Sequence, residues 1–151
     1  MLQSVPLDEM KNHLGKEMVS DWFQIDQGRI DAFADCTGDH QWIHVNRELA
    51  KKGPYGTTIA HGILTLCLAQ WLTRSMIVMP AGGKMVLNYG YNRVRFLNPV
   101  EVGSRIRTHV VMKQVENKGD GRILVTTEHT VEIEGQKKPA LVAEALAMFL
   151  A

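Results

Sequence analysis

The sequence predicts an α+β fold in which a curved antiparallel sheet wraps around one central buried helix. Two observations carry this prediction: a segment near the middle of the chain is apolar on almost every side, and the C-terminal half alternates apolar and polar residues. A helix that is apolar all round needs cover all round, and an alternating sheet has one apolar face to offer. Wrapping the sheet around the helix satisfies both needs.

The elements before the central helix are short. Residues 15–25 are a weak strand candidate, and residues 25–38 place Ile30 and Phe33 at helical spacing before a Thr-Gly stop, which predicts an amphipathic helix. A second short helix is expected over residues 46–52, with an asparagine as N-cap and Gly-Pro after it.

The central helix is predicted within IAHGILTLCLAQWLTRSMIVM, residues 59–79. Its apolar residues leave almost no polar face, so we expect burial on all sides. His61, Gln70 and Arg74 interrupt the segment well short of the ~20 apolar residues that a bilayer requires, so it is a poor membrane span.

Four strands are predicted after the Gly82-Gly83 pair, over residues 85–97, 106–112, 123–133 and 140–150. NKGDG between the second and third strands is typical of a hairpin turn, and a shift of apolar parity near residues 90–92 indicates a bulge. The last strand is apolar on both parities, so we expect it to be covered on two sides and to offer an edge for pairing. This arrangement is known as a hotdog fold.

Composition limits the possible partners. The 151 residues, 45% of them hydrophobic, are sufficient for one domain spanning 1–151, and 17 basic against 16 acidic residues without charge blocks argue against nucleic acid. Cys36 and Cys67 lack the spacing of a metal site or a disulfide scaffold, so we expect no metal and two buried thiols. The N-terminus has no secretory signal pattern, which favours a cytoplasmic protein.

The stretch TGDHQWIH places Asp39 and His44 five residues apart. Regular structure separates such a pair, because five residues turn about 140° beyond one full rotation on a helix and face opposite sides on a strand. The two side chains meet only if residues 38–43 form a turn. Spacing alone favours a non-catalytic explanation, in which Asp39 is an N-cap and His44 is a surface residue.

A second feature is AHG at the start of the central helix. A helix N-terminus presents unpaired amides, and Gly62 has no side chain to keep a ligand oxygen away from them, so an oxyanion hole is a candidate function. For an isolated His-Gly pair, close packing and capping by His61 are the more common explanation.

With both features in view, the sequence resembles the MaoC-like hydratases, which are (R)-specific enoyl-CoA hydratases of hotdog fold, and within them the nodulation protein N type. The matching motif is Gly38-Asp39, four residues, His44, five residues, Ala50, followed by Ala60-His61-Gly62 and the strand NRVRFLNPV. The chain departs from many relatives at Gln41-Trp42, where they have Asn-Pro, and at Cys67, where a serine hydroxyl is frequent.

The resemblance implies hydration of a trans-2-enoyl thioester to an (R)-3-hydroxyacyl product. It implies that His44 is the base on water, that Asp39 orients the same water and exchanges the C2 proton, and that the Gly62 amide holds the thioester oxygen. Coenzyme A enters as part of the substrate, and no cofactor is expected. Gln41, Trp42, Tyr55 and His61 are further candidates for substrate binding.

Other polar residues offer weaker candidates. Arg93 and Arg95 share a strand face that suits either coenzyme A phosphates or, more commonly, solvent. Four further histidines have no partner evident in the sequence and are expected on the surface: His13, His40, His109 and His129.

Two alternative functions stay open. A hotdog thioesterase would use the same acid, water and oxyanion site but release free thiol, and a non-catalytic acyl-CoA binding subunit would bind enoyl-CoA without turnover. Since hotdog domains usually pair their sheets, we expect a homodimer.

Overall fold

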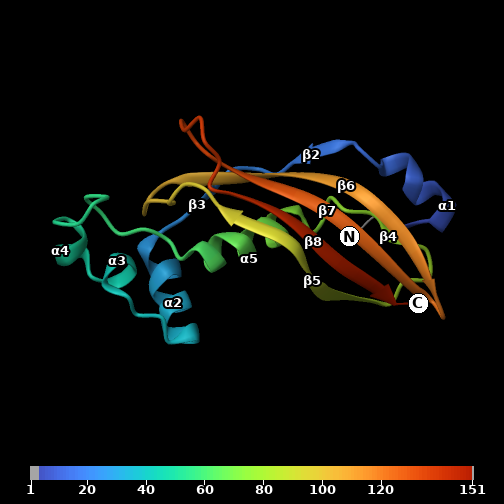
Figure 1. Ribbon diagram of the computed structural model, residues 1–151, viewed down its shortest axis with the longest axis horizontal. Helices are drawn as coiled ribbons and strands as arrows, with labels where there is room; N and C mark the ends of the chain where they lie inside the picture. The colour runs from blue at the N-terminus through green and yellow to red at the C-terminus, as the bar shows by residue number, and fades with distance from the viewer. Residues whose placement is uncertain (1–3, 151) are drawn as a thin grey trace.

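The computed structural model describes residues 4–150 and shows a strongly curved sheet lying over one long helix (Figure 1). The helices are α1 (Leu7–Met10), a 3-10 turn η1 (Lys11–His13), α2 (Gln27–Thr37), α3 (Trp42–Val45), α4 (Arg47–Ala50) and α5 (Gly62–Thr73). The strands are β1 (Ser4–Val5), β2 (Glu17–Val19), β3 (Phe23–Gln24), β4 (Met79–Pro80), β5 (Met85–Phe96), β6 (Arg105–Gly119), β7 (Arg122–Ile133) and β8 (Leu141–Leu150).

The main sheet is antiparallel throughout, in the order β2-β6-β7-β8-β5, with β3 also paired to β6. The α+β class, the central helix and the four C-terminal strands of the predicted hotdog fold are therefore confirmed. The weak strand candidate forms two short strands, β2 and β3. The strands β1 and β4 form a separate two-stranded parallel sheet that the sequence did not predict.

Local sequence signals explain the boundaries that were predicted correctly. Asp26 caps α2 by accepting from the Arg29 amide at 2.8 Å, and Gly38 ends the helix with φ 78°. Asp120 and Gly121, with φ of 51° and 70°, form the two-residue turn of the β6–β7 hairpin, which suits the positive φ values that such turns require. The register of β5 against β8 shifts between Asn88 and Gly90 and again between Tyr91 and Arg93, which is the predicted bulge.

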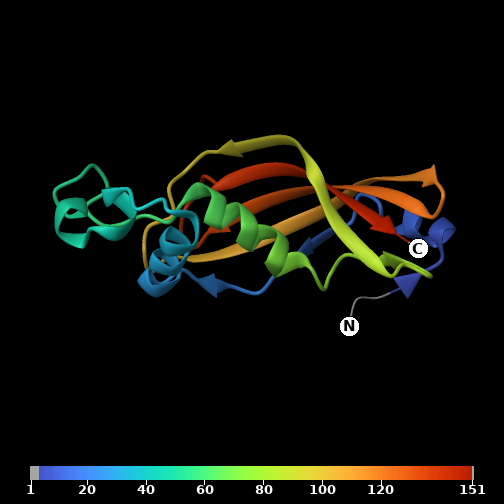
Figure 2. The same ribbon diagram turned by 90° about the horizontal axis from the view of Figure 1, so that it is seen from below.

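The inner face of the sheet packs against α5 through the predicted alternation. Ile106, Thr108, Val110 and Met112 of β6 are all fully buried, as are Val125 and Val131 of β7. Figure 2 shows α5 running along the concave side of β6, β7 and β8, with β5 at the edge. Among the described residues, no helix is both long and apolar enough to cross a membrane.

Three expectations about burial and edges are wrong. One side of α5 is open, since Ile63 and Trp71 are 52% and 55% exposed. Cys36 and Cys67 are exposed rather than buried. The edge of the sheet is β5 rather than β8, which lies between β7 and β5 and is buried on one face and half-buried on the other.

The exposed side of α5 and the edge strand belong to one continuous face. All twelve residues of β5 are exposed or half-buried, although the strand contains methionine, valine, leucine, tyrosine and phenylalanine. An edge strand with this composition leaves both its backbone groups and its apolar side chains uncovered. The burial of α5 was overestimated because sequence periodicity does not show which apolar side chains the rest of the chain covers.

Candidate active site

The segment from α2 to α4 extends beyond one end of the sheet, close to the N-terminus of α5 (Figure 1). Gly38, in its left-handed conformation, ends α2 and begins an irregular stretch that runs to Gln41. This stretch is the turn that a meeting of Asp39 and His44 required. The short helix α3 then begins at Trp42, where the sequence had suggested only a turn.

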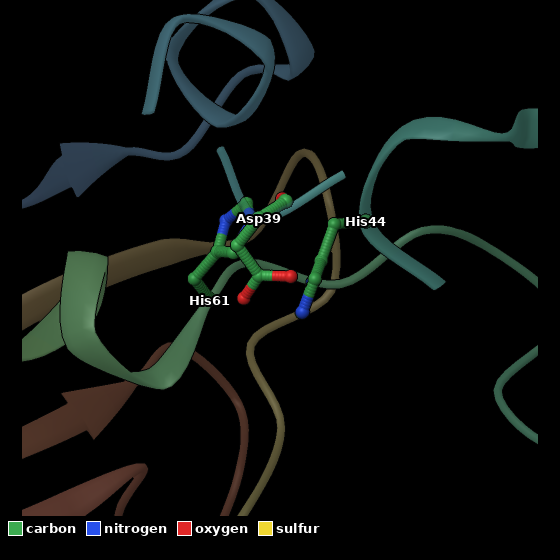
Figure 3. A group of neighbouring side chains, drawn as sticks. All are labelled: Asp39, His44 and His61. Atoms are coloured by element: carbon green, nitrogen blue, oxygen red, sulfur yellow. The ribbon is translucent and has the colours of Figure 1, made fainter. Parts of the chain in front are cut away.

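Asp39, His44 and His61 come together at this end of the molecule (Figure 3). Each of the three offers a polar side-chain atom within 4.8 Å of those of the other two. His44 and His61 are buried, with 7% and 3% exposure, whereas Asp39 is exposed. One acid on the solvent side and two imidazoles beneath it therefore form the cluster.

The His44 ring is fixed by a backbone carbonyl. Its Nδ1 lies 2.7 Å from the Ile59 carbonyl oxygen, which can only accept, so Nδ1 carries the proton and donates. The same segment is anchored by the Ile59 amide, which donates to the Ile43 carbonyl at 3.0 Å. In the neutral ring, Nε2 then has a free lone pair and can accept a proton.

Electrostatics also favour the neutral ring. Burial lowers the pKa of His44, the hydrogen bond to Ile59 opposes part of this effect, and neighbouring His61 lowers it further. His44 is therefore available as a base at neutral pH. The exposed His40 behaves in the opposite way, because a 2.8 Å hydrogen bond to Asp35 raises its pKa.

His61 connects the His44 ring to the backbone of Asp39. Its ring stacks on that of His44 with centroids 3.8 Å apart and planes 25° apart, and its Nε2 donates to the Asp39 backbone carbonyl at 2.9 Å. Phe33 also packs against the His61 ring, with ring centroids 4.9 Å apart. His61 thus contacts both members of the predicted acid–base pair, a role that its position beside Gly62 did not suggest.

The stacked rings do not suit a metal ion. A nitrogen lone pair lies in the plane of its ring, so two nearly parallel rings direct their lone pairs side by side and not toward one centre. One nitrogen of each ring donates to a backbone carbonyl, which leaves a single lone pair on each ring. The geometry of the cluster favours proton transfer over metal binding.

Gln27 holds the backbone of His44 in place. The sequence did not identify this residue. Its amide donates to the His44 carbonyl and to Asp31 at 2.8 Å each, and it accepts from the Thr58 hydroxyl at 2.5 Å. Gln27 is 8% exposed and Thr58 is 2% exposed. A glutamine in the first turn of a helix normally faces solvent, so no sequence signal distinguished it.

Gly62 is the first residue of α5, where the helix leaves its amides unpaired. A cavity of about 280 Å³ beside it is lined by His44, Tyr55, Thr65 and Phe96, among others. A Cβ on Gly62 would lie 3.0 Å from two atoms of the Phe96 ring, so a larger residue here would require that ring to shift. Gly62 therefore both packs closely against Phe96 and lies at the helix terminus, where backbone amides are unpaired.

The other candidate residues are placed as follows. Gln41 is exposed, and only its backbone amide approaches Asp39, at 3.4 Å from Oδ1. Trp42 packs against Gly53, outside this cavity, and Tyr55 lines the cavity. Cys67 lies instead on a second cavity along α5.

Of the four remaining histidines expected on the surface, His40 is exposed, His13 and His109 are half-buried, and His129 is buried. His129 is buried, with 2% exposure, because it shares the inward parity of β7. His109 bridges Glu17 and Glu132 across three strands, and His40 pairs with Asp35. Arg93 and Arg95 are exposed on β5, as the solvated alternative expected.

The protein is of the hotdog class, since its curved sheet packs on one central helix. An acid and two imidazoles lie at the N-terminus of that helix. The chain belongs to the MaoC-like dehydratase family, whose domain model matches residues 9–134. It is 50% identical over 132 residues to 3-hydroxyacyl-thioester dehydratase Z of Mycobacterium tuberculosis, covering 87% of both chains. It is 42% identical over 144 residues to nodulation protein N of Rhizobium leguminosarum, covering 94% of this chain and 89% of the relative.

Solved structures agree on the fold. The unliganded R-hydratase PhaJ1 from Pseudomonas aeruginosa superposes with a TM-score of 0.75 at 21% identity, covering 99% of this chain and 88% of that one. At this identity the similarity establishes the hotdog architecture alone.

Proposed function

We propose that the protein is a hydro-lyase that adds water to a trans-2-enoyl-CoA thioester, giving the (R)-3-hydroxyacyl-CoA, and catalyses the reverse dehydration. The observation that carries this proposal is the meeting of Asp39 and the neutral His44 beside the N-terminus of α5. Membership of a dehydratase family and the name of the 50% identical relative support the same reaction class.

In the proposed reaction, His44 Nε2 accepts a proton from water while the water oxygen bonds to C3 of the enoyl group. The C2–C3 π electrons move toward the thioester, and the negative charge that develops on its oxygen is held by the Gly62 amide. A proton returned through Asp39 then bonds to C2. Delivery of both groups from one side makes the addition syn.

His61 serves this site as a positioning residue. Its ring supports His44 by stacking, and its hydrogen bond to the Asp39 carbonyl fixes the turn that carries the acid. Two groups that share one water must be held to within a fraction of an ångström, since small displacements reduce rates strongly.

The chain offers a matched control for the test of this proposal. Asp35 and His40 have the same spacing of five residues and are joined by a 2.8 Å contact, but both are exposed. Asp39→Asn and His44→Asn are each expected to reduce kcat by on the order of 10²-fold or more, and Asp35→Asn and His40→Asn to leave it unchanged.

The assay follows loss of enoyl absorbance together with free thiol. Loss of absorbance without thiol identifies hydration, whereas thiol release would identify the thioesterase alternative. Binding of enoyl-CoA without any turnover by the unaltered protein would support the non-catalytic alternative. Near-normal hydration by Asp39→Asn or His44→Asn would refute the assigned roles.

We also propose that a second copy of the chain covers the face formed by β5 and the open side of α5. A free edge that carries exposed apolar side chains pairs readily with its own copy in antiparallel fashion, which closes both edges at once. Tyr89→Glu, at a residue 63% exposed on β5, is expected to shift sedimentation from dimer to monomer. Val19→Glu, on the opposite edge, is the control, and a monomeric unaltered protein would contradict the proposal.

A further inference from the structure

A cavity of about 540 Å³ lies between the second half of α5 and the sheet, away from the cluster of Asp39, His44 and His61. Trp71 of α5, Arg74 at the C-terminal end of that helix and Leu87 of β5 line its sides. The cavity is open on the side of β8 because Ala145 and Ala147 face inward there and leave space that larger side chains would fill.

The floor of this cavity is polar at its centre. Thr127 and His129 of β7 are 4% and 2% exposed, and a 2.9 Å hydrogen bond joins Thr127 Oγ1 to His129 Nε2. His129 Nδ1 is buried without a hydrogen-bond partner. The neighbouring inward positions on the same strand, Val125 and Val131, belong to two separate apolar clusters, so the polar pair interrupts the core between them.

A buried polar atom without a partner is costly, and such atoms are rare in folded proteins unless a ligand or water meets them. Burial lowers the pKa of His129 to about 4, so the ring is neutral at neutral pH. When the Thr127 hydroxyl donates to Nε2, the neutral ring carries its proton on Nδ1, which then has one hydrogen bond left to donate. It therefore suits a neutral oxygen or hydroxyl and offers no charge to balance a carboxylate.

The proposed dimer brings this cavity to the active site. In an antiparallel pair of β5 strands, residues 85–88 of one copy lie beside the other end of β5 in its partner. Residues 86–88 border the large cavity, and Phe96 borders the small cavity that contains His44 and Gly62. The large cavity of one subunit thus adjoins the thioester site of the other.

Resting on the proposed hydration of enoyl thioesters, we propose that this cavity receives the acyl group and that Thr127 and His129 select acyl groups carrying a neutral ketone or hydroxyl oxygen. The apolar walls contact the carbon chain, and His129 Nδ1 hydrogen-bonds the oxygen. The preferred substrate is then an oxygen-substituted enoyl thioester, not a plain alkyl one. His129 is a specificity residue and takes no part in the addition of water.

The test compares trans-2-octenoyl-CoA with the same thioester carrying a ketone at C5, C6 or C7. For at least one ketone position, kcat/KM is expected to exceed that of the plain substrate by about 10-fold or more, since sites that hydrogen-bond a substrate discriminate against analogues lacking the group. In His129→Leu the ratio should fall to about one. His129→Gln, which retains hydrogen-bonding groups, should keep part of the preference, and Ile133→Val, a buried change on the same strand outside the cavity, should keep all of it.

Thermal stabilisation by octanoyl-CoA and by the saturated ketone analogues gives a second measurement that needs no turnover. A ketone preference in stabilisation that His129→Leu removes supports the pocket even if hydration is absent, in which case only the proposed function fails. Hydration of all four substrates with ratios that His129→Leu and His129→Gln leave unchanged overturns this inference alone. A preference for a terminal carboxylate, tested with the trans-2-octenedioyl thioester, would overturn the neutral-oxygen assignment and point to Arg74.

Discussion

Replacing Gln27 with methionine tests whether the buried amide network holds His44 in place. The change keeps the length of the side chain but removes all three hydrogen bonds of Gln27, to His44, Asp31 and Thr58. Asp31 is half-buried and regains water, but the Thr58 hydroxyl and the His44 carbonyl become buried without a partner. Each such group costs about 1–3 kcal/mol, so the free energy of unfolding should fall by about 2–4 kcal/mol after the gain from burying an apolar side chain.

For a chain of this size, that loss corresponds to a decrease in Tm of about 5–15 °C, measured by thermal unfolding followed by circular dichroism. At a temperature where the variant is fully folded, kcat/KM should also fall on the order of 10-fold, because the backbone of the base has lost its anchor. Gln114→Met, at an exposed position of β6, is the matched control. A Tm within 1 °C of that of the control would refute the reasoning.

Three further outcomes are expected. Since burial lowers the pKa of His44, kcat/KM should fall in acid with an apparent pKa below 6.5, and a limb above 6.5 would argue against His44 as the base. Because the pKa of His129 is lower in the folded protein than in the unfolded chain, the unfolded chain binds a proton at a higher pH. Stability should therefore decrease as pH falls from 6.5 to about 4, by about 3 kcal/mol in total, and urea titrations of His129→Gln should lack that component. Gly121→Ala, at φ 70° in the β6–β7 turn, should lower the free energy of unfolding by about 1 kcal/mol in the same titrations, whereas no loss would indicate that the turn relaxes.

Periodicity and turn chemistry were sufficient to predict the sheet, the hairpin, the bulge and α2, because each of these depends on a few adjacent residues. The edge of the sheet was misplaced for a different reason. Strand order depends on which strands pair across long stretches of chain, and the apolar composition of β8 reflects burial between β7 and β5 and not exposure at an edge. Hydrophobic runs alone do not encode this order.

At the site, the sequence identified Asp39, His44 and Gly62 as positions of interest, and the fold places them at one end of α5. It did not identify the interactions that orient them. The Ile59 carbonyl, the Gln27 amide and the stacking of His61 all join segments that are 15 or more residues apart, and neither carbonyl groups nor glutamines carry a distinguishing pattern. The burial of His129 required only the parity of its own strand and was within reach of the sequence.

The position of α3 and α4 beyond the end of the sheet has a consequence for how the protein loses activity on heating. These two helices are attached to the rest of the molecule mainly through α2, the hydrogen bonds of His44 to Gln27 and Ile59, and the pairing of Ile43 with Ile59. Segments with few buried attachments open in local transitions well below global unfolding. The amides of this segment should therefore exchange with deuterium before those of β6 and β7, and activity should disappear over a temperature range in which the sheet is still intact.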